Sequence, residues 1–217
     1  MKIFIPFLFF FFQLNVSKSQ DTIYLKNPSF EDSPRRGGDY DETINGWFDC
    51  GLDEFPYNTP PDIHPTTDSV WGVSKPAHDG NTYLGMVTRQ MGTWEFMSQK
   101  LKNPIDSGLC YTFSAYLSTA EFYKSATYES PEVMVNFDAP VILLVWAGNR
   151  ICDKKELIGK SKPVTYREWK INHFKFQTHA TFRFITIEAF YVLPYAKAGN
   201  GHILVDGLSP IIEIQCE

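Results

Sequence analysis

The clearest structural signal in the chain lies in residues 78–101, which read HDGNTYLGMVTRQMGTWEFMSQKL. The stretch opens with an Asp-Gly-Asn turn at 79–81, because Gly and Asn adopt positive φ at low cost. Two runs with the composition of strands follow, Thr82–Val87 and Trp94–Leu101, and a polar break that contains Gly92 separates them. Side chains of the second run alternate between two faces, neither of them purely apolar. This pattern indicates either a core strand with polar ends or the floor of a binding surface.

Short strands between turn residues continue outward from this stretch in both directions. Cys110–Leu117 alternates cleanly, and Val141–Trp146 is a continuous apolar run of the kind found in fully buried strands. The Pro-rich segment Asp49–Ser69 is expected to be a long loop, and Ser118–Ser130 is expected to contain a helical turn or two. Further strands are expected at Tyr24–Glu31, Ile44–Phe48, Trp169–Phe176, Phe182–Ala189, Ile203–Leu208 and Ile211–Ile214. Short strands with Gly, Pro and Asn turns predict an all-β antiparallel β-sandwich, a jelly roll, in one domain at 21–217.

The first 20 residues have the pattern of a secretory signal peptide. Lys2 precedes an apolar run at 3–12, and the polar segment Ser-Lys-Ser-Gln follows at 17–20. The run is shorter than the roughly 20 apolar residues that a membrane helix needs. We therefore expect residues 1–20 to be removed. The mature chain would then be secreted, periplasmic or on the outer cell surface.

The mature chain is acidic and carries all four cysteines. Removal of Lys2 and Lys18 lowers the Lys and Arg count from 20 to 18 against 25 Asp and Glu, which gives a net charge of −7. An acidic surface argues against a nucleic-acid partner and against anionic membranes. An even number of cysteines in an exported chain predicts two disulfides, with three pairings open. The four residues are Cys50, Cys110, Cys152 and Cys216.

Three motifs together resemble a known family. Asn27–Glu31 near the start, Tyr111–Ser114 in the middle and Leu204–Ser209 near the end are similar to the galactose-binding-like jelly rolls of carbohydrate-binding modules. A closer resemblance is to jelly-roll regions of exported bacterial surface proteins, some associated with gliding motility. The segments that carry it are Thr59–Pro65, Trp71–Ser74, Gly80–Arg89 and Gly92–Leu101.

The resemblance implies a structural calcium ion. In such modules, acids beside the first and last strands help to bind calcium, which points to Glu31 and Asp206 with Asp79 or Asn81 as a further ligand. Calcium prefers several hard oxygen ligands, and carboxylates supply them. The alternative is that these acids are ordinary polar caps of strand ends.

The resemblance also implies a disulfide pairing. In the resembling fold the strand that begins at Cys110 runs antiparallel beside the last strand, so the start of one meets the end of the other. The expected pairs are therefore Cys110 with Cys216 and Cys50 with Cys152.

A sugar site needs flat rings for the apolar faces of pyranoses and fixed polar groups for their hydroxyls. One region of the sequence supplies both, and the alternative for each ring in it is burial in the core. Three other tryptophans, Trp47, Trp146 and Trp169, lie in apolar contexts and are expected in the core. The expected ligand-binding residues are Asp62, His64, Trp71, Asn81, Tyr83, Arg89, Trp94 and Glu95.

These features predict an exported, non-catalytic module that binds carbohydrate or the cell surface. The chain contains neither the His-Glu-x-x-His nor the Gly-x-Ser-x-Gly motif, so no residue is assigned a catalytic role. Two carboxylates are enough for glycoside hydrolysis, however, and the region offers several acids. The alternatives are therefore a carbohydrate-active hydrolase or esterase, and a structural surface-assembly protein. The expected partner is a glycan or cell-surface polysaccharide, with a surface protein as the second option.

Overall fold

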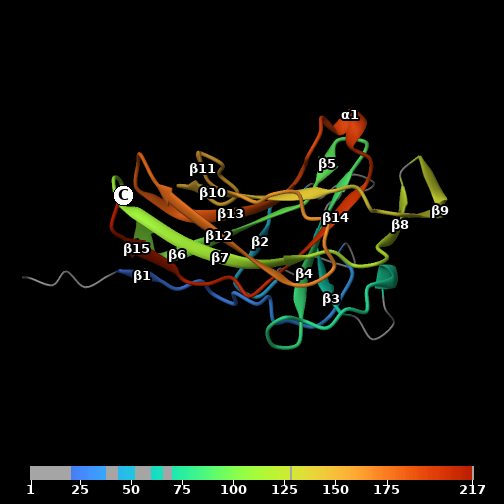
Figure 1. Ribbon diagram of the computed structural model, residues 1–217, viewed down its shortest axis with the longest axis horizontal. Helices are drawn as coiled ribbons and strands as arrows, with labels where there is room; N and C mark the ends of the chain where they lie inside the picture. The colour runs from blue at the N-terminus through green and yellow to red at the C-terminus, as the bar shows by residue number, and fades with distance from the viewer. Residues whose placement is uncertain (1–20, 38–43, 52–59, 66–69, 128, 217) are drawn as a thin grey trace, which may run out of the picture.

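The computed structural model describes residues 21–37, 44–51, 60–65, 70–127 and 129–216, which form two packed antiparallel β-sheets and one small separate sheet (Figure 1). This confirms the predicted all-β sandwich. The predicted signal peptide at 1–20 lies outside the described residues. None of the helices in the described part of the chain is long and apolar enough to cross a membrane.

The larger sheet has eight strands, and the smaller sheet of the sandwich has five. The first is ordered β1-β15-β7-β14-β4-β3, with β12 paired to β7 and β5 paired to β4, and the second is ordered β11-β10-β13-β6-β2. The eight strands are β1 (Thr22–Ile23), β3 (Asp62–His64), β4 (Tyr83–Arg89), β5 (Thr93–Trp94), β7 (Cys110–Ser118), β12 (Lys170–Gln177), β14 (Gly201–Asp206) and β15 (Ile211–Ile214). The five are β2 (Phe48–Asp49), β6 (Phe96–Ile105), β10 (Val141–Gly148), β11 (Glu156–Lys160) and β13 (Phe182–Tyr191).

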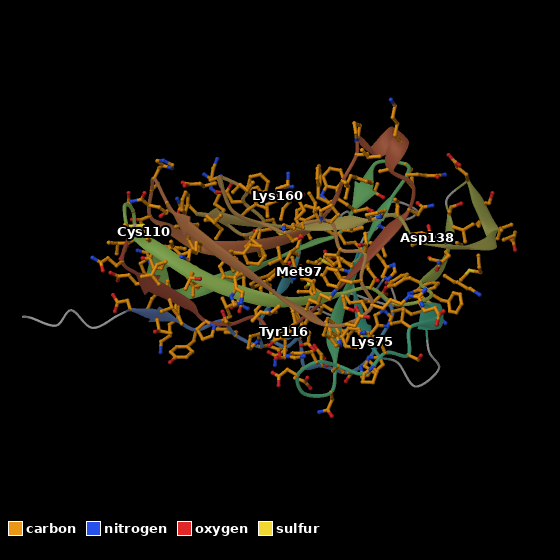
Figure 2. All side chains as sticks on the ribbon, viewed as in Figure 1. Lys75, Met97, Cys110, Tyr116, Asp138 and Lys160 are labelled. Carbon is orange, nitrogen blue, oxygen red and sulfur yellow. A yellow bond between two sulfur atoms is a disulfide. The ribbon has the colours of Figure 1, made fainter. Side chains whose placement is uncertain are left out.

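The turn at Gly92 joins β4 to β5 within the eight-stranded sheet, and the chain crosses to the five-stranded sheet between β5 and β6. β4 pairs with β14 in the eight-stranded sheet, whereas β6 pairs with β13 in the five-stranded sheet. Gly92 has φ +90°, so it turns the chain at a point where other residues would be strained. Residues 78–101 therefore join the two sheets, and Met97 lies in the space between them (Figure 2).

Two apolar clusters lie on opposite faces of the eight-stranded sheet. The main core fills the sandwich and takes Ile63, Leu84 and Ile203 from three of its strands. The neighbouring positions of these strands point the other way. They contribute to a second core of Val73, Tyr83, Val87, Tyr123, Phe137 and Leu204, which covers part of the outer face of this sheet.

The predicted disulfide pairing is confirmed. Cys50 is bonded to Cys152 and Cys110 to Cys216. The terminal strand β15 lies beside β7 in antiparallel register, with Ile214 opposite Cys110, so the two cysteines at this end of the sandwich meet.

The prediction of a helical turn within Ser118–Ser130 is wrong. This segment enters a hairpin of β8 (Lys124–Thr127) and β9 (Ser130–Asn136), which forms its own two-stranded sheet and projects at one end of the sandwich (Figure 1). Pro131 lies within β9, which pairs only with β8 among the described strands, so its other edge tolerates a missing amide donor. The short helices are elsewhere, at η1 (Val70–Gly72) and α1 (Tyr195–Ala198), and neither was expected.

Two other expectations are wrong in place or extent. The first strand, β1, ends at Ile23, before the expected strand Tyr24–Glu31, and within that range Asn27 and Phe30 adopt positive φ and turn the chain. The Pro-rich segment 49–69 is not entirely loop, since β3 at Asp62–His64 pairs with β4.

Candidate functional site

Strand β3 places two of the predicted site residues on the outer face of the eight-stranded sheet. Because Ile63 points into the main core, Asp62 and His64 point the opposite way, toward the second core. Asp62 Oδ1 accepts a hydrogen bond from the Gly37 amide at 2.6 Å, and its Oδ2 accepts one from the Tyr123 hydroxyl. Burial opposes ionisation of Asp62, but His64, Tyr123 and the Gly37 amide together hold its pKa below the usual range. Asp62 is therefore a buried anion that anchors Tyr123.

His64 is fully buried between two tyrosine rings, with centroids 5.9 Å from Tyr83 and 5.7 Å from Tyr123. It packs so closely on Gly85 that a Cβ there would lie 2.7 Å from His64 Cδ2, so only glycine fits. Neither ring nitrogen of His64 has a hydrogen-bond partner among the described residues. Its Nε2 is 3.8 Å from Asp62 Oδ2, which is an ion-pair distance but too long for a hydrogen bond. The imidazole thus keeps unused hydrogen-bonding capacity.

Arg89 and Glu95 form a second polar pair on the same side of the sheet. Arg89 Nη2 donates to Glu95 Oε1 at 2.6 Å, and the Val87 amide donates to Glu95 Oε2 at 2.9 Å. Burial raises the pKa of Glu95 to about 8; the Asp62 charge adds to this rise, and the Arg89 guanidinium opposes it. Arg89 Nη1 is buried, and no described residue hydrogen-bonds to it. We call Asp62, His64, Tyr83, Arg89 and Glu95 the polar cluster.

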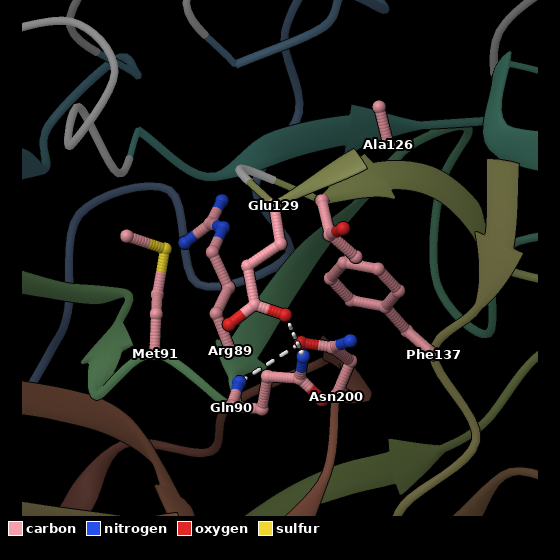
Figure 3. Close-up of a pocket in the computed structure, with 8 residues that line it drawn as sticks. Arg89, Gln90, Met91, Ala126, Glu129, Phe137 and Asn200 are labelled. Carbon is pink, nitrogen blue, oxygen red and sulfur yellow. Dashed lines mark hydrogen bonds between the residues drawn. The ribbon is translucent and has the colours of Figure 1, made fainter. Parts of the chain in front are cut away.

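Arg89 also lines a small pocket, shown in Figure 3. Its walls come from the turn after β4, the β8–β9 hairpin and the turn before β14. The Gln90 amide donates to Asn200 Oδ1 at 2.9 Å, and the Gln90 side chain donates to Glu129 Oε2 at 3.0 Å. The lining residues are Arg89, Gln90, Met91, Ala126, Thr127, Glu129, Phe137 and Asn200.

This pocket combines an apolar wall with several hydrogen-bonding groups. Phe137, Met91 and Ala126 supply the apolar atoms, and amide, hydroxyl, carboxylate and guanidinium groups face them. Its volume is about 250 Å³ only when the solvent at its open mouth is counted, and the enclosed part has room for about one water molecule. Of its eight lining residues, the sequence predicts only Arg89. The others come from three distant segments, and no sequence pattern indicates that these meet.

Trp71 and Asn81 lie outside the polar cluster. Trp71 packs at the border of the second core, and the Arg36 guanidinium lies 5.2 Å from its ring centroid. Asn81 is exposed, and its backbone amide donates to Glu31 Oε1 at 2.8 Å.

Trp94 lies in β5 of the eight-stranded sheet, but its side chain packs against β13 of the five-stranded sheet. Its indole Nε1 donates to Glu188 Oε1 at 2.5 Å, and Trp146 Nε1 donates to Glu188 Oε2 at 2.6 Å. Lys154 completes the group with an ion pair of 2.7 Å to Glu188. Trp94 and Glu95 are neighbours in an extended segment, so their side chains point to opposite sides. Of the tryptophans expected in the core, Trp47 is buried there, whereas Trp146 and Trp169 are half-buried.

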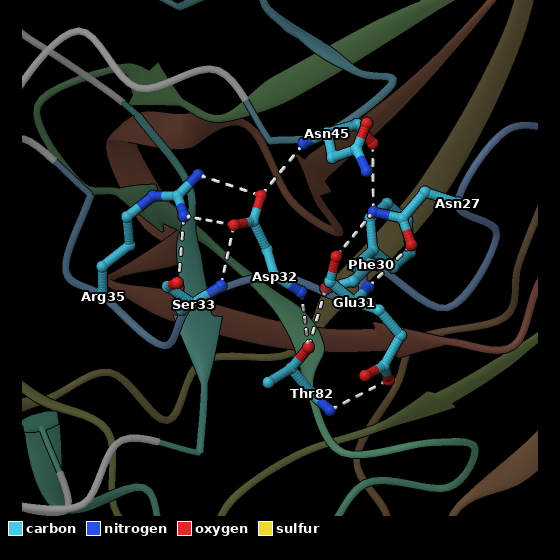
Figure 4. Close-up of polar contacts among 8 residues, drawn as sticks. All are labelled: Asn27, Phe30, Glu31, Asp32, Ser33, Arg35, Asn45 and Thr82. Carbon is cyan, nitrogen blue, oxygen red and sulfur yellow. Dashed lines mark hydrogen bonds and ion pairs between the residues drawn. The ribbon is translucent and has the colours of Figure 1, made fainter.

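The acids of the predicted calcium site bind backbone amides and a hydroxyl. Glu31 Oε1 accepts the amides of Asn81 and Thr82 at 2.8 and 3.1 Å, in the same region as the Asp32–Arg35 pair (Figure 4). Asp79 Oδ2 accepts the Ser29 hydroxyl at 2.6 Å. In the described ranges no three His, Cys, Asp or Glu side chains gather into a group that could hold a metal ion.

Asp206 holds the loop that begins at His78. Its Oδ2 accepts the amides of His78 and Asp79 at 2.7 and 3.0 Å, and its Oδ1 accepts the Gly207 amide. Burial raises the pKa of Asp206 to about 6 despite these bonds. The contacts are those of loop-capping carboxylates. They give no support to calcium, which stays a prediction.

Sequence comparison identifies no relatives: no family model matches the chain, and no curated protein matches it. Solved structures, in contrast, share its fold. A Stig cyclase from Fischerella sp. TAU, in complex with an indole compound, has a TM-score of 0.54 at 12% identity, covering 92% of this chain and 100% of the cyclase. The CBM22-1 xylan-binding domain from Paenibacillus barcinonensis Xyn10C has a TM-score of 0.50 at 15% identity, covering 93% of this chain and 99% of that domain.

An arabinose-bound α-L-arabinofuranosidase matches over 88% of this chain and 26% of the enzyme, with a TM-score of 0.51 at 10% identity. At these identities the likeness concerns the fold alone. The chain therefore has the β-sandwich fold found in a carbohydrate-binding module, a cyclase and part of a glycosidase.

Proposed function

We propose that this protein is a carbohydrate-binding module whose pocket at Arg89 takes one sugar residue of a glycan. The observation that carries the proposal is the composition of the pocket: Phe137 and Met91 offer an apolar wall, and Arg89, Gln90 and Thr127 offer hydrogen-bonding groups. A pyranose has the matching surface, with apolar ring faces and hydroxyls at its rim. The shared fold with a xylan-binding domain supports the same conclusion.

The proposal includes an exported location and, more finely, a bacterial surface context such as gliding motility. Two disulfides support export, because such bonds persist in oxidising compartments and are rare in the cytosol. The leader pattern at 1–20 points the same way.

A binder is favoured over a hydrolase by the state of the buried acid. Glu95 is 1% exposed, both its oxygens accept hydrogen bonds, and it does not line the pocket. A general acid must reach the atom that it protonates. Glu129 does line the pocket, and its Oε2 accepts a hydrogen bond from Gln90. It is the one carboxylate among the described lining residues, whereas glycoside hydrolysis uses a pair.

The test is retention on a panel of polysaccharides, with release of soluble product measured in the same tubes. We expect retention without product. The variant Gln90→Trp should fill the pocket from an exposed position and lower affinity at least tenfold. Gln177→Trp, the same substitution at an exposed position of β12, is the matched control and should bind like the original chain. Turnover of any polysaccharide would instead identify an enzyme, and equal binding by the two variants would place the site elsewhere.

A further inference from the structure

Buried polar side chains on the outer face of the eight-stranded sheet carry more hydrogen-bonding capacity than the fold uses. His64 has two unbonded ring nitrogens and Arg89 has an unbonded Nη1, counted against the described part of the chain. Buried polar groups nearly always have partners, since each unpaired one costs about 1–3 kcal/mol. Two such residues in one cluster indicate a site that is completed by something other than the fold.

The β8–β9 hairpin covers this cluster through two aromatic side chains. Tyr123 donates its hydroxyl to Asp62 and stacks on His202 with a centroid distance of 4.8 Å. Phe137, after the second strand, packs in the same second core. The ladder of the hairpin is internal, because β8 pairs with β9 and with neither large sheet. The hairpin is thus a unit that packs on the sheet without continuing it.

The His202 side chain hydrogen-bonds to both ends of the hairpin segment, at Ala120 and at Phe137, which we call its feet. The Ala120 amide donates to His202 Nε2 at 2.8 Å, and His202 Nδ1 donates to the Phe137 carbonyl at 2.5 Å. The two contacts require the neutral tautomer with its proton on Nδ1. Loss of either contact weakens the attachment of one foot, which is otherwise held by the bonds of Thr119 to Tyr166 or of Ala139 to Asn200.

The pocket and the polar cluster are adjacent parts of one region. Arg89 belongs to both, since its side chain pairs with Glu95 and also lines the pocket. Phe137 belongs to the pocket wall and to the covering apolar cluster. Movement of the hairpin away from the sheet would therefore join the pocket to the buried cluster.

We propose that the pocket is the mouth of a larger, occluded ligand site, and that the β8–β9 hairpin opens about its feet at His202 to let a hydroxyl-rich ligand reach His64 and Arg89. This inference rests on the proposed function and extends its site. A neutral imidazole has one donor and one acceptor, and a sugar hydroxyl can satisfy both. An anion would satisfy only the donors, and it would meet the carboxylates of Asp62 and Glu129 nearby. The ligand class is therefore a neutral saccharide.

Chemical labelling of His64 tests the opening without any ligand. Diethyl pyrocarbonate modifies accessible imidazoles, and peptide mass spectrometry reads each histidine separately. The His179 side chain, 94% exposed, is the internal reference. If the hairpin opens while the rest of the chain stays folded, the opening exposes little surface. The labelling rate of His64 should then not change between 0 and 1 M urea. Labelling that rises with urea in step with global unfolding would overturn the proposal.

Two variants sharpen this test. His202→Leu removes both foot contacts and should raise the labelling rate of His64 at least tenfold. Leu101→Ala weakens the main core at a distance and should leave that rate within twofold, although it lowers the global stability. Faster labelling in Leu101→Ala would overturn the proposal, because opening would then be global unfolding. This comparison holds even if His202→Leu does not fold.

The outcome is separable from that of the proposed function. Suppose that the chain retains no polysaccharide but His64 is labelled through local opening. This result would support the occluded site and refute the proposal that its ligand is a carbohydrate. Retention of polysaccharide by a chain that labels only on global unfolding would confine the ligand to the pocket and overturn the inference.

Discussion

Glu95 shows how burial decides the charge of a single residue. Its pKa is raised to about 8, against 4.5 for an ordinary glutamate, because burial penalises the carboxylate more than Arg89 stabilises it. A raised folded-state pKa means that the group's contribution to stability is complete below pH 4.5 and is lost as the pH rises through 8.

The corresponding prediction compares the chain with Glu95→Gln, which keeps the size of the side chain and cannot ionise. The free energy of unfolding of the original chain, relative to the variant, should fall between pH 5 and pH 8. Urea denaturation at three pH values measures it, and the exposed substitution Glu121→Gln should show no such trend. A relative stability that rises with pH would mean that Glu95 is ionised and held by Arg89.

Trp94 gives a second prediction at this scale. Its indole is bonded to Glu188 and its ring packs edge-on against Phe190 at 5.2 Å, so it stabilises the five-stranded sheet. Trp94→Ala should lower the free energy of unfolding by about 2–3 kcal/mol, below the range for fully buried rings, and leave glycan affinity unchanged. Loss of affinity with unchanged stability would move the sugar platform to this sheet.

The residues of the polar cluster could be predicted from the sequence, but the residues that line the pocket beside it could not. Asp62, His64, Tyr83, Arg89 and Glu95 were all expected in one site, and the fold brings them to one face. Trp94 was expected there as well and lies elsewhere, since it alternates with Glu95. The pocket residues Phe137 and Asn200 could not be predicted, because their approach depends on how a hairpin and a distant turn pack.

At the scale of elements, the β8–β9 hairpin is the feature that sequence patterns describe least well. Its alternation is weak, and Val133 and Met134 remain exposed, so neither helix nor strand periodicity was evident. The main strands were predicted because each buries one regular face. The hairpin has its own ladder between β8 and β9, and contacts with His202 and Asp62 hold it on the sheet.

The hairpin should respond to acid through His202. Burial lowers the pKa of His202 to about 4 from its ordinary 6.5, so its contribution to stability is complete above pH 6.5 and is lost as the pH falls toward 4. The free energy of unfolding relative to His202→Leu should decrease over this window. The difference between the two chains is needed because Asp206, with its pKa raised to about 6, has the opposite trend. A relative stability that is constant from pH 7 to pH 4 would contradict the role of His202.

For the whole molecule, two long-range disulfides tie the sandwich together. They join residues 102 and 106 positions apart, so each restricts a large part of the unfolded chain. Replacing both Cys110 and Cys216 with serine should lower the free energy of unfolding by about 2–5 kcal/mol. Urea denaturation of the purified variant measures this loss. A loss below about 0.5 kcal/mol would show that the unfolded chain is already compact without the disulfide.

The proposed function requires that the chain binds a glycan through the pocket at Arg89. A glycan array probed in parallel with the original chain and with Gln90→Trp tests it most directly. We predict that the original chain binds a group of glycans that share one neutral terminal sugar, and that the variant loses at least nine-tenths of the signal on that group. An array with no bound glycan, or with the same pattern for both chains, would contradict the account.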